Sequence, residues 1–308
     1  MGKAVSNKND RPLVTFALFA YNQEEYIREA IEGAFSQSYE PLEIILSDDG
    51  SSDATFEIME TMAAKYQGPH TVKVRQSVEN RGLANHINEC AEEIHGAIVI
   101  MAAGDDVSYP NRTEQIVEEF QSGKEVYGVL SGYRTIPENF EGKHSYAIRN
   151  KKISLAEIIM SGGGVQIGAT YGYRKECFTN PTKLPSWLES EDRLLPFRAK
   201  MLGKVHYIDD VLIDYRVQLG QKKIEKNKKR VESYNHPEHM NLLFMELNQF
   251  HKNGDINRFK FFYAKLLLKG LQTLISKGSK YGFWGIIRQI ILLVMRLIRK
   301  LSTMINKF

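Results

Sequence analysis

The first 120 residues alternate between short apolar runs and segments with helical periodicity, and this alternation restricts the fold more than any other feature. The run LVTFALFAY (13–21) is apolar at almost every position, which is typical of a strand buried on both faces of a sheet. Apolar residues then recur at spacings of three and four over 26–35, which predicts a helix with one buried face. Because this pair of elements is repeated, the sequence predicts an α/β fold with a doubly wound, mostly parallel sheet.

The remaining elements continue the alternation up to about residue 217. We expect strands at 42–46, 72–75, 97–101, 126–134, 165–174 and 205–217, and helices at 54–66, 83–94, 190–202 and after Pro110. From about residue 218 the chain becomes basic and polar, and helical periodicity without a strand signal then runs to its end. We therefore divide the chain into a disordered lead-in (1–11), an α/β domain (12–217) and a basic helical C-terminal region (218–308).

Composition narrows the range of functions. With 308 residues and 43% hydrophobic side chains the chain can bury a full core, and its formal net charge of +4 gives no support to a nucleic-acid partner. Cys90 and Cys177 are its only cysteines and stand far apart, which favours a reducing compartment and a cytoplasmic location. The eight histidines form no HxH or HExxH pattern, so they indicate no metal site of their own.

Two pairs of adjacent aspartates follow predicted strands. Asp48 and Asp49 come after the strand at 42–46, and Asp105 and Asp106 come after the strand at 97–101. Doubly wound sheets bind ligands beyond the carboxyl ends of their strands, where a carboxylate can accept hydrogen bonds from a nucleoside or hold a cation that carries phosphates. Each pair therefore suits one half of a nucleotide diphosphate. The alternative is ordinary turn chemistry, because Asp, Gly and Ser dominate turns for local reasons.

An ordered set of motifs makes the functional reading more specific. The motifs are AYNQEEYIREAIEGAFSQSYEPLEIILSDDGSSD, NRGLANHIN, AAGDD and ESEDRLLPFRAKMLGKVHYIDDVLIDYR. In this order and spacing they resemble the successive motifs of family 2 glycosyltransferases with the GT-A fold, over roughly residues 12–217. The resemblance implies a GT-A catalytic domain, a nucleotide-sugar donor, a divalent metal ion, an acceptor hydroxyl and inversion at the anomeric carbon.

The resemblance also implies a donor site, position by position. Asp49 resembles the acid that pairs with the donor base, and Asp48 is its neighbour in the same loop. Ala20, at the end of the first strand, is expected to contact the base through its backbone, and Asn22 belongs to the same nucleotide-sugar-binding set. Arg81 in NRGLA matches the family arginine near the nucleotide and the diphosphate.

The second acidic pair is expected on the metal side of the donor. Asp106 resembles the acid that binds Mg²⁺ or Mn²⁺ directly, and Asp105 lies closer to the ribose. One or two protein carboxylates are sufficient, because the diphosphate and water complete the octahedral shell. The chain has Gln218 where many relatives place a histidine, so Arg216, Gln218 or a basic residue of 222–230 is expected to contact the diphosphate or the metal in its place.

The segment SEDR resembles the Glu-Asp motif at the start of an acceptor-side helix. We expect Asp192 to be the base that removes the acceptor hydroxyl proton, with Glu191 supporting it. The alternative is helix capping by Ser190, since acids also favour a helix N-terminus. The Gly-rich stretch before it (161–168) permits close backbone approach to a sugar, or serves sharp turns.

Two other functions fit parts of the pattern. A membrane-associated protein that binds a nucleotide sugar without catalysis, such as a scaffold, would keep the donor residues, although intact Asp106 and Asp192 favour an enzyme. A sugar nucleotidyltransferase would share the sheet and the metal acid. Such an enzyme usually has a Gly-rich, basic loop after the first strand, where this chain has AYNQEEY. For a transferase we expect a glycan or lipid-linked acceptor, as in the assembly of bacterial surface polysaccharides.

The last segment (284–308) is predicted to be an amphipathic helix with an apolar face and a basic face. Its arginines interrupt the apolar residues too often for it to span a bilayer. Phe283 and Trp284 stand at its start as interfacial anchors do, and the basic run at 222–230 adds attraction to anionic lipid. We expect peripheral binding to the inner face of the cytoplasmic membrane. The alternative is an ordinary helix packed on the catalytic domain.

Overall fold

The structure is a computed structural model, and it describes four segments: residues 11–136, 152–161, 165–217 and 237–278. The chain divides into two compact units, residues 1–224 and 225–308, and each is described by itself. Several features predicted above lie outside the described residues: the lead-in up to residue 10, the glycines at 162–164, Gln218 with the domain boundary near it, the basic run at 222–230 and the helix at 284–308.

In the described part of the first unit, nine strands form one sheet in the order β3-β2-β1-β4-β8-β6-β9-β5, with β7 beside β9. The parallel half consists of β1 (Val14–Ala20), β2 (Leu42–Asp48), β3 (Thr71–Gln76) and β4 (Ile98–Ala103). The mixed half consists of β5 (Val107–Ser108), β6 (Val126–Ile136), β7 (Lys152–Ile153), β8 (Tyr171–Arg174) and β9 (Lys204–Arg216). The predicted doubly wound α/β fold is confirmed.

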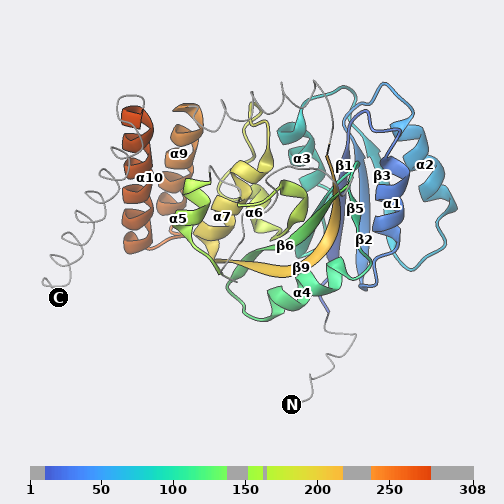
Figure 1. Cartoon of the computed structure of the whole chain (residues 1–308), viewed down its shortest axis with the longest axis horizontal. Coiled ribbons are helices and arrows are strands. Elements are labelled where there is room, and N and C mark those ends of the chain that lie inside the picture. Colours follow the sequence, from blue (N-terminus) through green and yellow to red (C-terminus); the bar gives the residue numbers. More distant parts are fainter. Residues whose placement is uncertain (1–10, 137–151, 162–164, 218–236, 279–308) are drawn as a thin grey trace, which may run out of the picture. The chain divides into compact units, whose positions relative to one another are not determined.

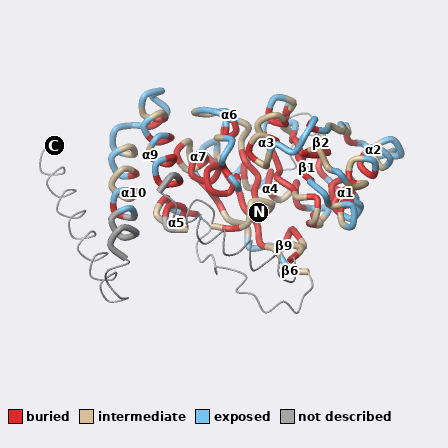
Figure 2. The backbone as a smooth tube through the Cα atoms, turned by 90° about the horizontal axis from the view of Figure 1, so that it is seen from above, coloured by how far each residue is buried: buried red, intermediate tan, exposed pale blue. Residues whose placement is uncertain are grey.

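Helices cover both faces of the sheet (Figure 1). One face carries α1 (Ile27–Phe35), α2 (Thr55–Lys65) and α4 (Arg112–Gln121), and the other carries α3 (Leu83–Ala91), α6 (Glu176–Thr179) and α7 (Leu195–Leu202), with α5 (Leu155–Met160) near α7. All seven residues of β1 are buried, as the continuous apolar run predicted, and Figure 2 shows the buried centre. Phe16 and Leu18 pack in the core below α1 and α2, while the ring of Phe19 meets that of His86 on α3 at 5.2 Å.

The strand predicted at 165–174 is wrong over its first part. Only Tyr171–Arg174 is extended, and Gly168–Thr170 forms a 3₁₀ turn before it. Gly168 has no room for a side chain in this turn, because an added Cβ would lie 1.7 Å from Oε1 of Glu191. The apolar and β-branched residues resemble a strand locally, but in the fold this segment turns where Gly168 lies against the side chain of Glu191.

The helix predicted at 190–202 is divided into two elements. Glu191–Arg193 forms a 3₁₀ turn, and α7 begins only at Leu195. Pro196 lies in the first turn of α7, where it lacks the N–H that would bond to the carbonyl of Asp192 if the helix extended back to residue 190. The two predicted acceptor-side acids therefore lie on a tight turn in front of the helix.

The described part of the second unit contains two helices, α9 (Pro237–Lys252) and α10 (Arg258–Gly278), so the predicted helical periodicity after residue 218 is confirmed over these two ranges. Its apolar side chains Leu247, Phe250, Ala264 and Leu268 are completely buried. No helix in the described segments combines the length and the apolar character needed to cross a membrane.

Candidate active site

Three loops meet beyond the carboxyl ends of β1, β2 and β4. The N–H of Asp49 donates to the carbonyl of Ala20 (3.0 Å), and the N–H of Gly104 donates to the carbonyl of Phe19 (2.9 Å). Gly104 approaches so closely that an added Cβ would lie 2.7 Å from the Cβ of Ala20. The loops after three adjacent parallel strands therefore form one continuous region, at the edge where such sheets bind ligands.

Asn22 joins the first two of these loops. Its φ of 51° is in the left-handed region, which is uncommon for a residue other than glycine. Its Oδ1 accepts the N–H of Ser52 (2.8 Å), and its own N–H donates to Oγ of Ser51 (2.9 Å). Asn22 therefore fixes the shape of the loop that follows Ala20.

Asp48 is completely buried, and its carboxylate binds its own turn and the end of β3. Oδ2 accepts the N–H of Ser51 (2.8 Å) and Nε2 of Gln76 (3.1 Å), and the Ser51 hydroxyl also donates to Oδ1. The turn alternative considered for the first acidic pair thus describes the contacts of Asp48.

The side chain of Asp49 holds a different loop. Its two carboxylate oxygens accept the backbone N–H groups of Arg81 (3.2 Å) and Gly82 (3.1 Å). Burial raises the pKa of Asp49, and the charges of Glu89 and Asp48 add to this, although the two N–H groups oppose it. Asp49 therefore fixes the segment that carries Arg81, whose own side chain is 52% exposed.

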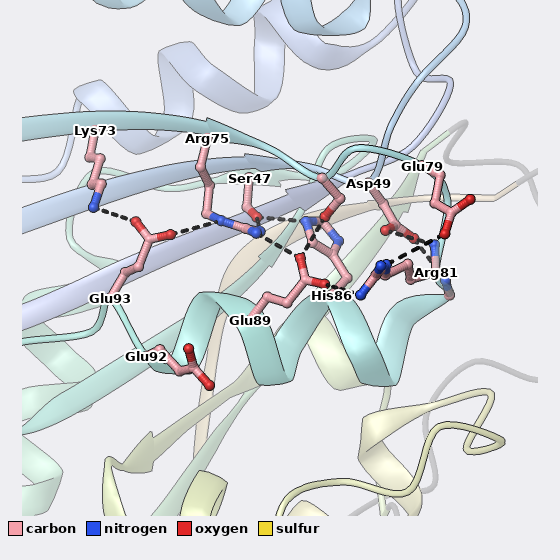
Figure 3. A network of polar contacts seen from close by, with 12 residues as sticks. Ser47, Asp49, Lys73, Arg75, Glu79, Arg81, His86, Glu89, Glu92 and Glu93 are labelled. Carbon is pink, nitrogen blue, oxygen red and sulfur yellow. Dashed lines mark hydrogen bonds and ion pairs between the residues drawn. The ribbon is translucent and has the colours of Figure 1, made fainter.

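Behind Asp49, a chain of polar contacts links β2, β3 and α3 (Figure 3). The Arg75 guanidinium donates to Oγ of Ser47 (2.7 Å) and to Oε2 of Glu89 (2.9 Å), and Nη1 of Arg81 lies 3.5 Å from Oε1 of Glu89. The Ser47 hydroxyl lies 2.6 Å from Nε2 of His86 and, since it accepts from Arg75, it can donate to a neutral imidazole. Burial, followed by the charge of Arg75, lowers the pKa of His86 to about 4.

Asp106 and Arg216 come together although they are far apart in the sequence. Oδ1 of Asp106 accepts the N–H of Arg216 (2.9 Å), and Nε of Arg216 donates to the carbonyl of Asp105 (3.1 Å). Oδ2 of Asp106 is buried and accepts no hydrogen bond from the described residues. Burial, followed by the charge of Asp105, raises the pKa of Asp106 well above its usual range.

The Arg216 guanidinium is also held by α1. Its Nη2 donates to Oε2 of Glu29 (2.6 Å), and its carbon atom Cζ lies 4.5 Å above the ring centre of Tyr26. The end of β9 is thus attached both to the loop after β4 and to the helix after β1.

The residues present fit a divalent cation in one specific way. In the described part of the chain, no three His, Cys, Asp or Glu side chains are close enough to hold an ion by themselves. Asp106 nevertheless offers a buried oxygen that no described residue binds, with Asp105 beside it. An ion that also binds a diphosphate and water needs only one or two protein carboxylates.

Glu191 and Asp192 are both buried, at 7% and 3% exposure. Among the described residues, the Ser190 hydroxyl donates to Oδ1 of Asp192 (2.6 Å) and makes no capping hydrogen bond to the backbone, although both acids lie in the first turn of the 3₁₀ element as the capping alternative also expected. The charges of both acids help to raise the pKa of the buried Tyr171 hydroxyl, an effect that is mainly due to burial. Glu191 and Asp192 therefore face the same region as the start of β8.

The sequence analysis missed Arg112, the first residue of α4. Its side chain is completely buried, which lowers its pKa to about 9, and the charge of Asp106 acts in the opposite direction. The sequence offered one indication, which is the position of this arginine at the start of a predicted helix. The helix dipole opposes a positive charge in the first turn, so a cation there needs another partner.

With this geometry, the comparisons with known proteins identify the class. Residues 15–179, more than half of the chain, match the family model described as Glycosyl transferase family 2, and the chain belongs to that family. The putative glycosyltransferase EpsE of Bacillus subtilis is 34% identical over 130 residues, which are 42% of this chain and 46% of that protein. An uncharacterized glycosyltransferase of Rickettsia prowazekii is 33% identical over 221 residues, 68% of this chain. The chain spans less than two thirds of the length of either relative, 46% and 65%.

Solved structures identify the fold as GT-A. Residues 1–349 of S. aureus TarS in complex with UDP-GlcNAc superpose with a TM-score of 0.65 at 19% identity, covering 86% of this chain and 72% of that one. The mannosyltransferase PcManGT from Pyrobaculum calidifontis, in complex with GDP-Man and Mn²⁺, gives a TM-score of 0.56 at 15% identity, with coverage of 96% and 82%.

His86 predicts a specific dependence of stability on pH. Its pKa is lower in the folded protein than the usual value of 6.5, so on acidification the unfolded chain takes up the proton first. The free energy of unfolding should fall between about pH 6.5 and pH 4, by up to about 3 kcal/mol at ~1.36 kcal/mol per pKa unit. Urea unfolding measured across this pH range should show this loss of stability in the wild type and not in His86→Gln. The exposed His95→Gln is the control, and an unchanged slope in His86→Gln would contradict the assignment.

Proposed function

We propose that this chain is an inverting glycosyltransferase that moves a sugar from a nucleotide-diphosphate donor to an acceptor hydroxyl. The observation that carries this proposal is Oδ2 of Asp106, a buried oxygen at the carboxyl edge of the sheet with no hydrogen-bond partner among the described residues. Asp49 lies in a neighbouring loop of the same edge, so the two acids suit opposite ends of a nucleotide diphosphate. The complexes of TarS with UDP-GlcNAc and of PcManGT with GDP-Man support this donor class.

In this proposal the base of the donor binds beside Asp49. The loop that Asp49 holds places the half-exposed Arg81 side chain where it can reach the nucleotide and diphosphate. Ala20 and Asn22 form the adjoining loop, and Asp48 contributes by stabilising the turn that follows β2.

We further propose that Asp106 binds Mg²⁺ or Mn²⁺, with Asp105 placed toward the ribose and Arg216 toward the diphosphate. When bound, such an ion stabilises negative charge on the leaving diphosphate. Arg216 contributes through two contacts, since its N–H orients Asp106 and its Nε holds the Asp105 carbonyl.

Asp192 is the proposed base. Its carboxylate would accept the proton of the acceptor hydroxyl as that oxygen attacks the anomeric carbon, and the nucleotide diphosphate leaves from the opposite side with inversion. The Ser190 hydroxyl donates to Oδ1 of Asp192 and so helps to orient its carboxylate. Glu191 supports the turn by packing against Gly168.

For the biological setting we propose a cytoplasmic enzyme at the inner face of the membrane, acting on a lipid-linked or surface-polysaccharide precursor. The basic segment at 222–230 and the amphipathic segment at 284–308 support this placement through their sequence. In the second unit, Phe259 and Tyr263 are exposed on α10 beside basic residues, which is a composition suited to a lipid interface.

Donor binding tests the proposal directly. Ligand binding to the folded state raises thermal stability, so a panel of UDP-, GDP- and TDP-sugars with Mn²⁺ should raise the Tm for one nucleotide class. Asp106→Ala should lose the metal-dependent part of this shift while remaining folded, and the exposed Asp210→Ala should keep it. A full metal-dependent shift in Asp106→Ala, or no shift with any donor in the wild type, would overturn the proposal.

Turnover tests the base. Asp192→Asn preserves shape but cannot accept the proton, so nucleotide release should fall by about 10²–10⁴ with unchanged donor affinity. The neighbouring exposed Glu189→Gln should release nucleotide at the wild-type rate. Near-normal release in Asp192→Asn would transfer the role to Glu191. Donor binding without turnover in the wild type would favour the non-catalytic binding protein.

Membrane association has its own test. The full chain should bind vesicles that contain an anionic lipid at low salt and should release them as salt rises, because the attraction is electrostatic. Deleting residues 281–308 should abolish this binding while donor binding remains. Neutral phosphatidylcholine vesicles are the control. A full chain that ignores anionic vesicles at low salt would contradict the membrane proposal and leave the transferase proposal standing.

A further inference from the structure

β4 and β8 separate at a defined point in the sheet. Their antiparallel pairing ends with Ile100 opposite Gly172. The carbonyls of the next two residues, Met101 and Tyr171, both accept from Nη2 of Arg112, at 2.7 and 3.5 Å. The guanidinium therefore stands where the next bonds of the ladder would form, and it binds the ends of both strands while holding them apart.

The same guanidinium also reaches the two sides of the candidate site. Nη2 donates to the carbonyl of Ala169 (2.5 Å), in the turn that packs against Glu191. Nη1 donates to Oγ of Ser108 (2.9 Å), two residues beyond Asp106. One side chain thus links the segment that follows the donor-side acids to the turn beside the acceptor-side acids.

A buried cation at this place is costly, and general stability does not explain it. Arg112 has no exposed surface, its Nε has no hydrogen-bond partner among the described residues, and it lies in the first turn of a helix, where the dipole opposes a positive charge. Continued pairing of β4 with β8 would satisfy the same carbonyls without burying a charge. The planar fork of an arginine can instead bind several carbonyls in a fixed geometry.

We propose that Arg112 is a positioning residue for sugar transfer, which keeps the ends of β4 and β8 apart and so sets the spacing between the donor-side and acceptor-side acids. This inference rests on the proposed function. Arg112 acts through Asp106, Ser108 and the turn at 168–170, without contact to the substrate.

The test compares Arg112→Lys with Arg198→Lys in the full chain. A lysine keeps the charge, but its single ammonium group cannot span the carbonyls that the guanidinium joins. Arg198 is also completely buried and donates to the carbonyls of Cys177 and Phe178 (3.3 Å each), so it controls for the loss of a buried guanidinium.

Hydrogen exchange reports the positioning itself. In Arg112→Lys, exchange should become at least about tenfold faster at 101–108 and 166–171 and remain unchanged at 77–89, where Asp49 and Arg75 hold the chain. Arg198→Lys should leave 101–108 unchanged. Ser108→Ala removes one bond to the guanidinium and should shift the same segments less, so it replaces Arg112→Lys if that variant does not fold.

Kinetics report the consequence. With the sugar nucleotide that the wild type uses, tested first with UDP-GlcNAc and GDP-Man in Mn²⁺, Arg112→Lys should lower kcat by about 10²-fold, as a misplacement near 1 Å can. The KM for the donor should change by less than about threefold, because the Asp49 loop is untouched. An unchanged kcat, or equal losses of kcat in Arg112→Lys and Arg198→Lys, would overturn the inference. If the wild type uses no donor, the proposed function fails, whereas unchanged exchange at both segments refutes the positioning by Arg112 alone.

Discussion

The pairing of β1 with both β2 and β4 is the constraint on which the rest of the molecule depends. In this register Ala20 stands opposite Asp48, and Phe19 stands opposite Ala103, so the strands end at one level. A slip of one residue would turn every side chain of a strand to the other face, and the fully buried β1 would then place Thr15 and Phe19 among the wrong helices. The core thus determines the register, and the register brings the acidic loops together.

The acids at this edge perform different tasks although their sequence motifs look alike. Asp48 satisfies its own turn, and Asp49 holds the backbone of the Arg81 loop, so the first pair mainly builds the site. Within the described segments, Asp106 accepts a backbone hydrogen bond at Oδ1 and none at Oδ2. Burying a carboxylate oxygen without a hydrogen-bond partner is costly in a folded protein. Such an oxygen therefore indicates a ligand site more strongly than a carboxylate whose oxygens are both hydrogen-bonded.

The parallel half of the fold and the location of the acids could be predicted because both leave local patterns. A strand buried on both faces appears in the sequence as a continuous apolar run. The aspartates that follow such a run indicate where the strand ends. The turn at 168–170 could not be predicted in this way, since it lies against Glu191, a neighbour that is distant in the sequence. Three other features leave no periodic signal in the sequence for the same reason. They are the contact of Asp106 with Arg216, the break in the predicted helix before Pro196 and the burial of Arg112.

The sheet changes from parallel to mixed where β8 pairs antiparallel with β4. The proposed donor-side and acceptor-side residues lie largely on different sides of this boundary. The parallel strands and their loops carry the proposed donor contacts except that of Arg216, which lies at the end of β9, and the family model matches residues 15–179, which cover these parallel strands from Thr15 onward. Glu191 and Asp192 follow the end of that match, on a turn attached to the mixed half. In such a fold the proposed donor-binding loops follow strands whose register is fixed by pairing on both sides. The acceptor side is formed by turns outside the parallel strands, and such turns can vary in sequence without disturbing the sheet.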